Sequence, residues 1–223
     1  MSEYKPNILL YGACQLSIVA KWLKKFSCIN ILQPLPYGIE ISFFWERSIF
    51  CPRYIGKNKS LLEALNDADY FIFQDAMNPK IFTSKYLYDQ SDSKKLCIPR
   101  FHLDIPSNFD EQSISSSVKI NVAELSRRAS LMQSRYESDF IDMSRWIEDN
   151  WQDKCLWGSF CRHPSMFYYI ELFQRIKNKL FLDLDIDPLK HIPEFSHPPL
   201  AENERLQIQK IFPNMEIYKY DNE

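Results

Sequence analysis

The sequence predicts an α/β protein. A parallel sheet with a Rossmann- or flavodoxin-like arrangement forms its N-terminal half, and a helix-rich C-terminal half packs over that sheet. Two observations predict this class. Short apolar runs alternate with amphipathic segments over residues 1–111, as in strands joined by crossover helices, whereas residues 118–223 carry mainly helical spacing. Because 45% of the 223 residues are hydrophobic and 25% are charged, the chain can bury a core. We therefore expect a single α/β domain over residues 1–223.

The first strand and the first helix show the change of hydrophobic period. Residues 7–11 form a short apolar run between Pro6 and Gly12, which is typical of a buried strand. Apolar residues then recur at i, i+3, i+4 and i+7, with lysines on the other side, and predict an amphipathic helix over residues 16–23. The same reasoning predicts further strands at 29–32, 70–73 and 96–98 and a short helix at 61–65.

Helical spacing dominates the second half of the chain. It predicts helices over residues 122–136, 139–151, 164–180 and 201–212, followed by a last strand at 215–218. Two segments are predicted as loops, the serine-rich residues 112–117 between the halves and the proline-containing residues 182–199.

Composition and charge exclude several classes of function. Four glycines argue against a glycine-rich phosphate loop, and a net charge of −2 without a long basic run gives nucleic-acid binding no electrostatic support. The six cysteines show no C-x-x-C spacing and the four histidines no H-x-x-x-H spacing, so no metal site is predicted. No signal peptide is evident, and no stretch approaches the roughly 18 apolar residues of a membrane span. We expect a cytoplasmic protein with reduced thiols.

Polar side chains follow three of the predicted strands. The first strand is followed by residues 12–17 (Gly-Ala-Cys-Gln-Leu-Ser), the third by residues 74–79, which include Gln74 and Asn78, and the fourth by residues 100–102. Ligands of open parallel sheets bind at the carboxyl ends of the strands. We therefore expect the functional site at this edge, with Arg100 and Arg162 among the first residues to meet a polyanionic ligand.

Cys14 is the main candidate for chemistry. It lies between a strand and a helix, where free backbone N–H groups stabilise negative charge and lower the pKa of a thiol. Ser17 lies three residues on, near Cys14 in the first helical turn. Backbone N–H groups of this turn, helped by Gln74 or Asn78, could hold an oxyanion. The alternative is that Cys14 is a small buried residue filling a tight turn.

His163 is the second candidate. Pro164 fits the first position of the following helix, which places His163 at the helix cap. A histidine there stays neutral, because the helix N-terminus disfavours imidazolium, and a neutral imidazole can act as a general base. The alternative is a capping histidine with a structural hydrogen bond.

These motifs resemble those of the WcbI-type polysaccharide biosynthesis proteins. The resemblance rests on Gly-x-Cys-Gln-x-Ser at residues 12–17, on Gln74 at the end of a later strand and on His163-Pro164 opening a helix. It spans roughly residues 6–180, and Ala13 stands where the family pattern usually has Asn. Those proteins are regarded as coenzyme A-binding acetyltransferases of bacterial capsule assembly. The strand–turn–nucleophile layout also resembles SGNH-type hydrolases, although Phe160 occupies the position of the aspartate in their Asp-x-x-His pattern.

The resemblance implies acyl transfer from acetyl-CoA to a sugar hydroxyl, with a glycan or its precursor as acceptor. Cys14 and His163 would form the reactive pair, with Ser17 and Gln15 lining the coenzyme A pocket. Either Cys14 takes the acyl group as a thioester, or His163 deprotonates the acceptor directly. Two other hypotheses stay open, an SGNH-like esterase or deacetylase and a non-catalytic module that binds coenzyme A or a nucleotide. The acceptor sugar and the oligomeric state are not encoded in any motif.

Overall fold

The computed structural model describes residues 4–12, 14–32, 62–75, 83–101, 110–158, 163–187, 189–190 and 200–218. The chain divides into two compact units. The first unit comprises Met1–Arg100, Met132–Ile141 and Arg175–Pro193, and the second comprises Phe101–Leu131, Asp142–Gln174 and Glu194–Glu223.

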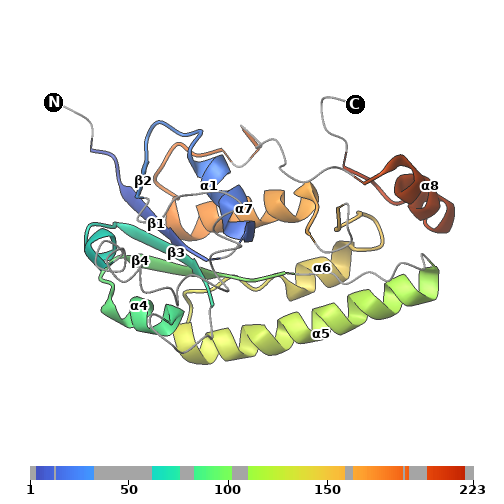
Figure 1. Cartoon of the computed structure of the whole chain (residues 1–223), viewed down its shortest axis with the longest axis horizontal. Coiled ribbons are helices and arrows are strands. Elements are labelled where there is room, and N and C mark those ends of the chain that lie inside the picture. Colours follow the sequence, from blue (N-terminus) through green and yellow to red (C-terminus); the bar gives the residue numbers. More distant parts are fainter. Residues whose placement is uncertain are drawn as a thin grey trace, which may run out of the picture. The chain divides into compact units, whose positions relative to one another are not determined.

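The first unit is built on a parallel sheet of four strands (Figure 1). The strands are β1 (Asn7–Tyr11), β2 (Asn30–Leu32), β3 (Tyr70–Gln74) and β4 (Lys94–Ile98), in the order β2-β1-β3-β4. Every neighbouring pair is parallel, and the register places Tyr11 beside Phe73 and Gln74 beside Ile98. The predicted α/β class and its parallel sheet are confirmed.

Helices α1 (Cys14–Leu23) and α4 (Ser84–Gln90) lie on opposite faces of this sheet (Figure 1). On the α4 face, Leu87 packs in a cluster of buried side chains from alternate positions of the strands, including Leu9, Phe71 and Phe73. Because helices cover both faces, the strands are apolar throughout rather than alternating. Residues 62–66 are helical where a short helix was predicted, while α4 was not predicted. Its only strong sequence marker is Thr83, whose hydroxyl accepts from the Tyr86 N–H as the N-cap.

The second unit is mainly helical. It contains α6 (Ser144–Asn150) and α8 (Glu202–Ile211) together with the first parts of two helices that continue into the first unit, α5 (Glu111–Tyr136) and α7 (Met166–Leu180). In this unit α5 buries Ile114, Val118, Val122 and Leu125, which recur at helical spacing. A stacked pair of Phe101 and Tyr168, with ring centroids 4.8 Å apart, adds to its core.

Two predictions around α5 and α6 are wrong. Residues 112–117 belong to α5 rather than to a loop, because the Asp110 carboxylate accepts from the Ser113 N–H at 2.8 Å and starts the helix before the serines. The helix predicted over residues 139–151 begins only at Ser144. Residues 139–141 instead extend along the edge of β4, where the Cys97 N–H donates to the Asp139 carbonyl at 2.7 Å.

The last elements match the prediction in part. The helix predicted over residues 201–212 is α8. The strand predicted at 215–218 is reduced to a bridge between Glu216 and Lys154. The described residues of the 182–199 segment, 182–187 with 189–190, form neither helix nor strand.

Candidate functional site

The order of the strands reverses between β1 and β3. The chain passes from β1 to β2 on one side and then returns across the sheet to β3 on the other side of β1. In open α/β sheets, ligands bind outside the carboxyl ends of the strands at such a reversal. Gly12 follows β1 and Gln74 ends β3, so both residues lie at this point.

Gly12 and Gln74 are in direct contact. A Cβ atom on Gly12 would lie 3.0 Å from Gln74 Oε1 and 3.1 Å from both Cβ and Cγ of Gln74. That separation is tighter than an ordinary contact, so a side chain at residue 12 would require Gln74 to shift.

The Gln15 and Gln74 side chains form a buried amide pair. Gln74 Nε2 lies 3.3 Å from Gln15 Oε1 and 3.4 Å from the Pro99 carbonyl oxygen, and both glutamines are only 2% exposed. The carbonyl of Gln74 also accepts from the Ser84 hydroxyl at 2.8 Å. These bonds join the start of α1, the end of β3, the residue after β4 and the start of α4. The two predicted binding residues, Gln15 and Gln74, are therefore buried and in contact with each other at the carboxyl edge of the sheet.

Cys14 is the first residue of α1, and Ser17 lies in the first turn of the same helix. That turn contains no acidic residue, so nothing within it neutralises the positive end of the helix dipole. The backbone placement fits the predicted role of Cys14, and the role itself stays a prediction.

A second polar group at the carboxyl edge was not predicted. Asp75 directly follows Gln74, and its carboxylate accepts from the Tyr136 hydroxyl and from Arg135 Nη1, the latter at 2.9 Å. Burial, followed by the hydrogen bond to Asp75, raises the pKa of Tyr136, and burial raises the pKa of the Cys97 thiol, which suits an inert cysteine. Arg135 and Tyr136 end a long helix distant in sequence, so no local pattern indicates this contact.

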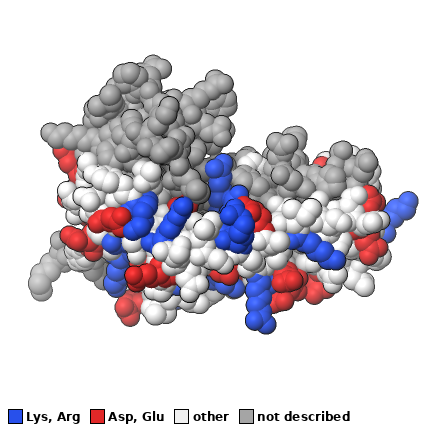
Figure 2. Space-filling view, turned by 90° about the horizontal axis from the view of Figure 1, so that it is seen from below, with Lys and Arg blue, Asp and Glu red and all other residues white. Residues whose placement is uncertain are grey.

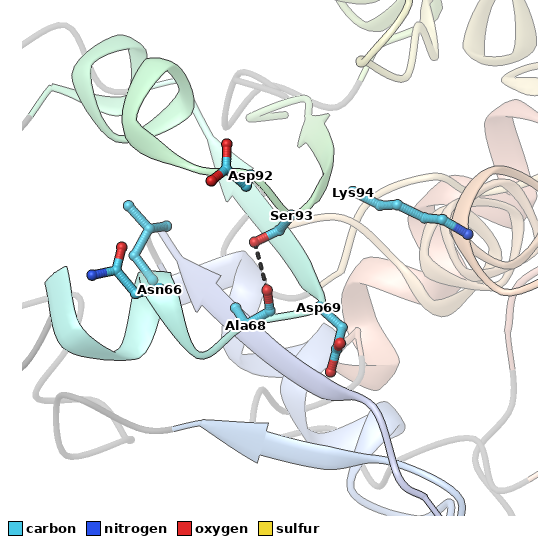
Figure 3. A pocket seen from close by; sticks show the side chains of 7 residues that line it. Asn66, Ala68, Asp69, Asp92, Ser93 and Lys94 are labelled. Atoms are coloured by element: carbon cyan, nitrogen blue, oxygen red, sulfur yellow. Dashed lines mark hydrogen bonds between the residues drawn. The ribbon is translucent and has the colours of Figure 1, made fainter.

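Two cavities lined by described residues of the first unit lie toward the opposite edge of the sheet. A cavity of about 420 Å³ at the amino ends of β3 and β4 is lined by Leu65, Asn66, Ala68, Asp69, Asp92, Ser93 and Lys94 (Figure 3). Two of its polar residues, Asp69 and Ser93, are hydrogen-bonded to other segments of the chain. The Ser93 hydroxyl donates to the Ala68 carbonyl at 2.8 Å (Figure 3). The Asp69 carboxylate accepts from the Asn7 N–H at 2.7 Å and from the Tyr4 hydroxyl at 2.5 Å.

A neighbouring cavity of about 360 Å³ contains three lysines, Lys94, Lys95 and Lys179. Lys95 Nζ donates to the Tyr88 carbonyl at 2.8 Å and Lys179 Nζ to the Ser138 carbonyl at 2.7 Å. Lysine on an edge strand such as β4 also discourages pairing with another chain. Parallel sheets bind ligands at the other edge, so we do not place the functional site in either cavity.

His163 belongs to the second unit and does not cap α7. The Gly158 N–H donates to the His163 carbonyl and the Ser165 N–H to the Leu156 carbonyl, both at 2.9 Å, and Pro164 is bridged to Trp157. The helix begins only at Met166, so the predicted cap position is wrong. Pro164 fits this ladder because its missing N–H is not used there. The half-buried His163 therefore precedes the helix by three residues.

The structure brings together only some of the predicted site residues. Gly12, Gln15 and Gln74 meet at the carboxyl edge of the sheet, and Arg100 follows the end of β4 by two residues at the same edge. Asn78 and Arg162 lie outside the described residues. Cys14 belongs to the first unit and His163 to the second, and their pairing stays a prediction.

Charge is mixed on the face shown in Figure 2, where basic and acidic side chains alternate over the described residues. On α5, for example, Glu124 pairs with Arg127 and Arg128 at 2.7 Å each, and these pairs lower the pKa of Glu124 to about 2. Within the described ranges no three His, Cys, Asp or Glu side chains are grouped to hold a metal ion. The described helices also include none with the length and apolarity needed to cross a membrane.

Comparison with known proteins supports the fold. No model of a protein family matches the sequence, and no curated protein sequence matches it significantly. The chain is similar in structure to WcbI, described as a novel polysaccharide biosynthesis enzyme, in a native form without a disulfide bond between coenzyme A and a cysteine of that protein. The TM-score is 0.58 at 15% sequence identity, and the match covers 83% of this chain and 74% of WcbI. This chain therefore shares the fold of a polysaccharide biosynthesis enzyme.

Proposed function

We propose that this protein is a coenzyme A-dependent O-acyltransferase that moves an acetyl group from acetyl-CoA to a sugar hydroxyl in glycan biosynthesis. The observation that carries the proposal is the packing of Gly12, Gln15 and Gln74 at the reversal of strand order, directly beside the helix that Cys14 begins. The fold likeness to WcbI and the motifs at residues 12–17 and 163–164 add support.

The residues at this edge fit the demands of such a donor. The N-terminus of α1 favours negative charge, and Arg100 adds a cation at the same edge. The buried Gln15–Gln74 pair joins the end of β3 to the start of α1, the helix that Cys14 begins.

Two routes of transfer suit these residues. In the first, the Cys14 thiolate attacks the acyl carbon and the bond to the coenzyme A sulfur breaks. The acceptor hydroxyl then attacks the enzyme thioester, His163 takes its proton, and the Cys14 thiolate leaves. In the second, His163 deprotonates the acceptor, which attacks the acyl carbon of acetyl-CoA directly while the α1 turn stabilises the oxyanion. The bond to the coenzyme A sulfur then breaks and coenzyme A leaves as the thiolate.

Ligand binding is the first test. We expect coenzyme A, acetyl-CoA and adenosine 3′,5′-bisphosphate each to raise the melting temperature, because a ligand that binds only the folded state stabilises it. Absence of a shift with all three would contradict both the acyltransferase and a binding module of the same ligands.

Substitution of the reactive pair is the second test. His163→Ala should abolish acetyl transfer by either route and Cys14→Ala should abolish it by the first, while both retain coenzyme A binding. Cys28→Ala removes a half-buried free thiol of the first unit and serves as the control. Detection of a labelled acetyl group on Cys14 in a trapped intermediate would support the first route. Retention of wild-type transfer by both variants would favour the non-catalytic module, and hydrolysis of an aryl acetate without acceptor would favour the esterase.

A further inference from the structure

Ser165 occupies the N-cap position of α7. The first bond of this helix runs from the Tyr169 N–H to the Ser165 carbonyl at 3.4 Å, and the helix itself begins at Met166. The N–H groups of Met166 and Phe167 precede that bond, so the helix offers them no acceptor. The first turn of α7 has no acidic residue, and the positive end of this 15-residue helix is uncompensated within the turn.

The Ser165 hydroxyl is buried without a hydrogen-bond partner. Ser165 is 5% exposed, and its Oγ atom has no partner among the residues that the structure describes. A serine at an N-cap normally accepts from an N–H of the first turn. Because nearly all buried polar groups in proteins are hydrogen-bonded, this exception needs an explanation.

Ser144, in the same unit, shows what a structural serine looks like at this level of burial. It is also 5% exposed and also lies at the start of a helix, α6. Its hydroxyl donates to Asp142 Oδ1 at 2.7 Å, and its N–H lies 2.8 Å from the same oxygen. The contrast indicates that the Ser165 hydroxyl is not there to hold the fold.

The antiparallel bridge between Trp157 and Pro164, just before α7, places Ser165 and His163 on one face of the extended backbone. Trp157 and Pro164 are bridged, and side chains alternate along extended backbone, so these two residues share one face. His163 and Ser165, on either side of Pro164, therefore share the other. The hydroxyl and the imidazole that we propose as base are thus presented together beside the start of α7.

We propose that Ser165 is a substrate-binding residue whose hydroxyl, at the start of α7, donates a hydrogen bond to an anionic oxygen of the molecule that reacts beside His163. This assignment rests on the proposed function. The oxygen has two sources in that reaction, a phosphate of the acyl donor or the oxyanion formed at the acyl carbon, and both are acceptors that a helix N-terminus favours.

Stability measurements test the hydroxyl in the absence of ligand. In urea unfolding, Ser165→Ala should leave the midpoint at or above that of the wild type, because it removes a buried group that has no partner. Ser144→Ala should lower the midpoint, because it breaks a hydrogen bond to a carboxylate. Equal loss of stability in the two variants would overturn the proposal.

Kinetics and binding test the ligand. We expect Ser165→Ala to lower kcat/KM roughly tenfold to a hundredfold, the range for a lost hydrogen bond to a charged group, while Ser144→Ala keeps the wild-type value. A rise in KM and in the coenzyme A dissociation constant assigns the oxygen to a phosphate, and a fall in kcat alone assigns it to the reacting oxyanion. Wild-type kcat and KM in Ser165→Ala would overturn the proposal.

A binding test with inorganic pyrophosphate distinguishes failure of this proposal from failure of the proposed function. If the wild type binds neither coenzyme A nor its fragments, the acyltransferase assignment fails by itself. A thermal shift with pyrophosphate that is present in the wild type and in Ser144→Ala but absent in Ser165→Ala then still supports an anion site at Ser165. In that case, identical responses of the wild type and Ser165→Ala to pyrophosphate overturn it.

Discussion

The two edges of the sheet use polar residues in different ways. At the carboxyl edge, Gln15 and Gln74 are buried and bonded to each other, and Gly12 is small so that Gln74 can approach. At the amino edge, Asp69 and Ser93 border an open cavity and tie chain segments together. Buried amides cost free energy unless they are satisfied, whereas groups beside water do not. The comparison teaches that a cavity need not mark a functional site, because the polar groups beside this one join chain segments, whereas those of the carboxyl edge meet where parallel sheets bind ligands.

The carboxyl edge should be the more sensitive to added volume. We expect Gly12→Val to lower the free energy of unfolding by about 3 kcal/mol, because its Cβ would meet Gln74 at 3.0 Å and must displace a buried side chain. Chemical denaturation measures the loss. Gly158→Val is the matched control, since the atom of the described residues that its Cβ would meet is the His163 carbonyl oxygen, at an ordinary contact distance of 3.8 Å. Equal effects of the two substitutions would show that the close approach at Gly12 is unimportant.

Removing one amide of the buried pair should have the next largest effect. Gln74→Leu deletes the donor that Gln15 Oε1 accepts from, and we expect a loss of about 2 kcal/mol. The double variant Gln15→Leu/Gln74→Leu should recover part of that loss, because it replaces both polar groups with apolar ones. A double-mutant cycle measures the coupling, and strictly additive losses would contradict the pairing.

At the amino edge, a smaller effect is expected. Ser93→Ala removes one partly buried hydrogen bond to the Ala68 carbonyl and should cost about 1 kcal/mol. Coenzyme A binding, measured by calorimetry, should not change. A weakened affinity would move the functional site toward this edge of the sheet and reverse the comparison.

The smallest effect concerns alkaline pH. The stability of the folded chain should change little near neutral pH and should fall increasingly above pH 10. Burial and a hydrogen bond to Asp139 at 2.9 Å raise the pKa of Tyr88 to about 12, whereas its ordinary value is 10. Between these values the unfolded chain loses the phenolic proton and the folded chain keeps it, so folding stability falls as the pH rises. Tyr88→Phe should flatten the decline over pH 10–12 in urea unfolding. An unchanged slope would show that Tyr88 is not shifted.

Much of the fold could be predicted because its markers are local. The strand at residues 7–11, the helix after it and the strand ends that carry Gln74 and Arg100 all follow from hydrophobic period and breaking residues. The serine-rich start of α5 was not predicted as helix. There a capping carboxylate and buried positions four residues apart outweigh the weak helix propensity of serine.

The sequence by itself determined an α/β protein whose first strand leads, through a glycine, into a helix that begins at Cys14. Those features depend on neighbours along the chain. Only the tertiary structure decided that Gly12 makes room for Gln74, that Asp75 binds Arg135 and Tyr136 from a distant helix, and that Pro164 lies in a ladder rather than opening α7. The first two contacts join residues far apart in the sequence, and the third depends on which backbone hydrogen bonds the folded chain leaves unused. Hydrophobic periodicity along the chain predicts neither kind of contact.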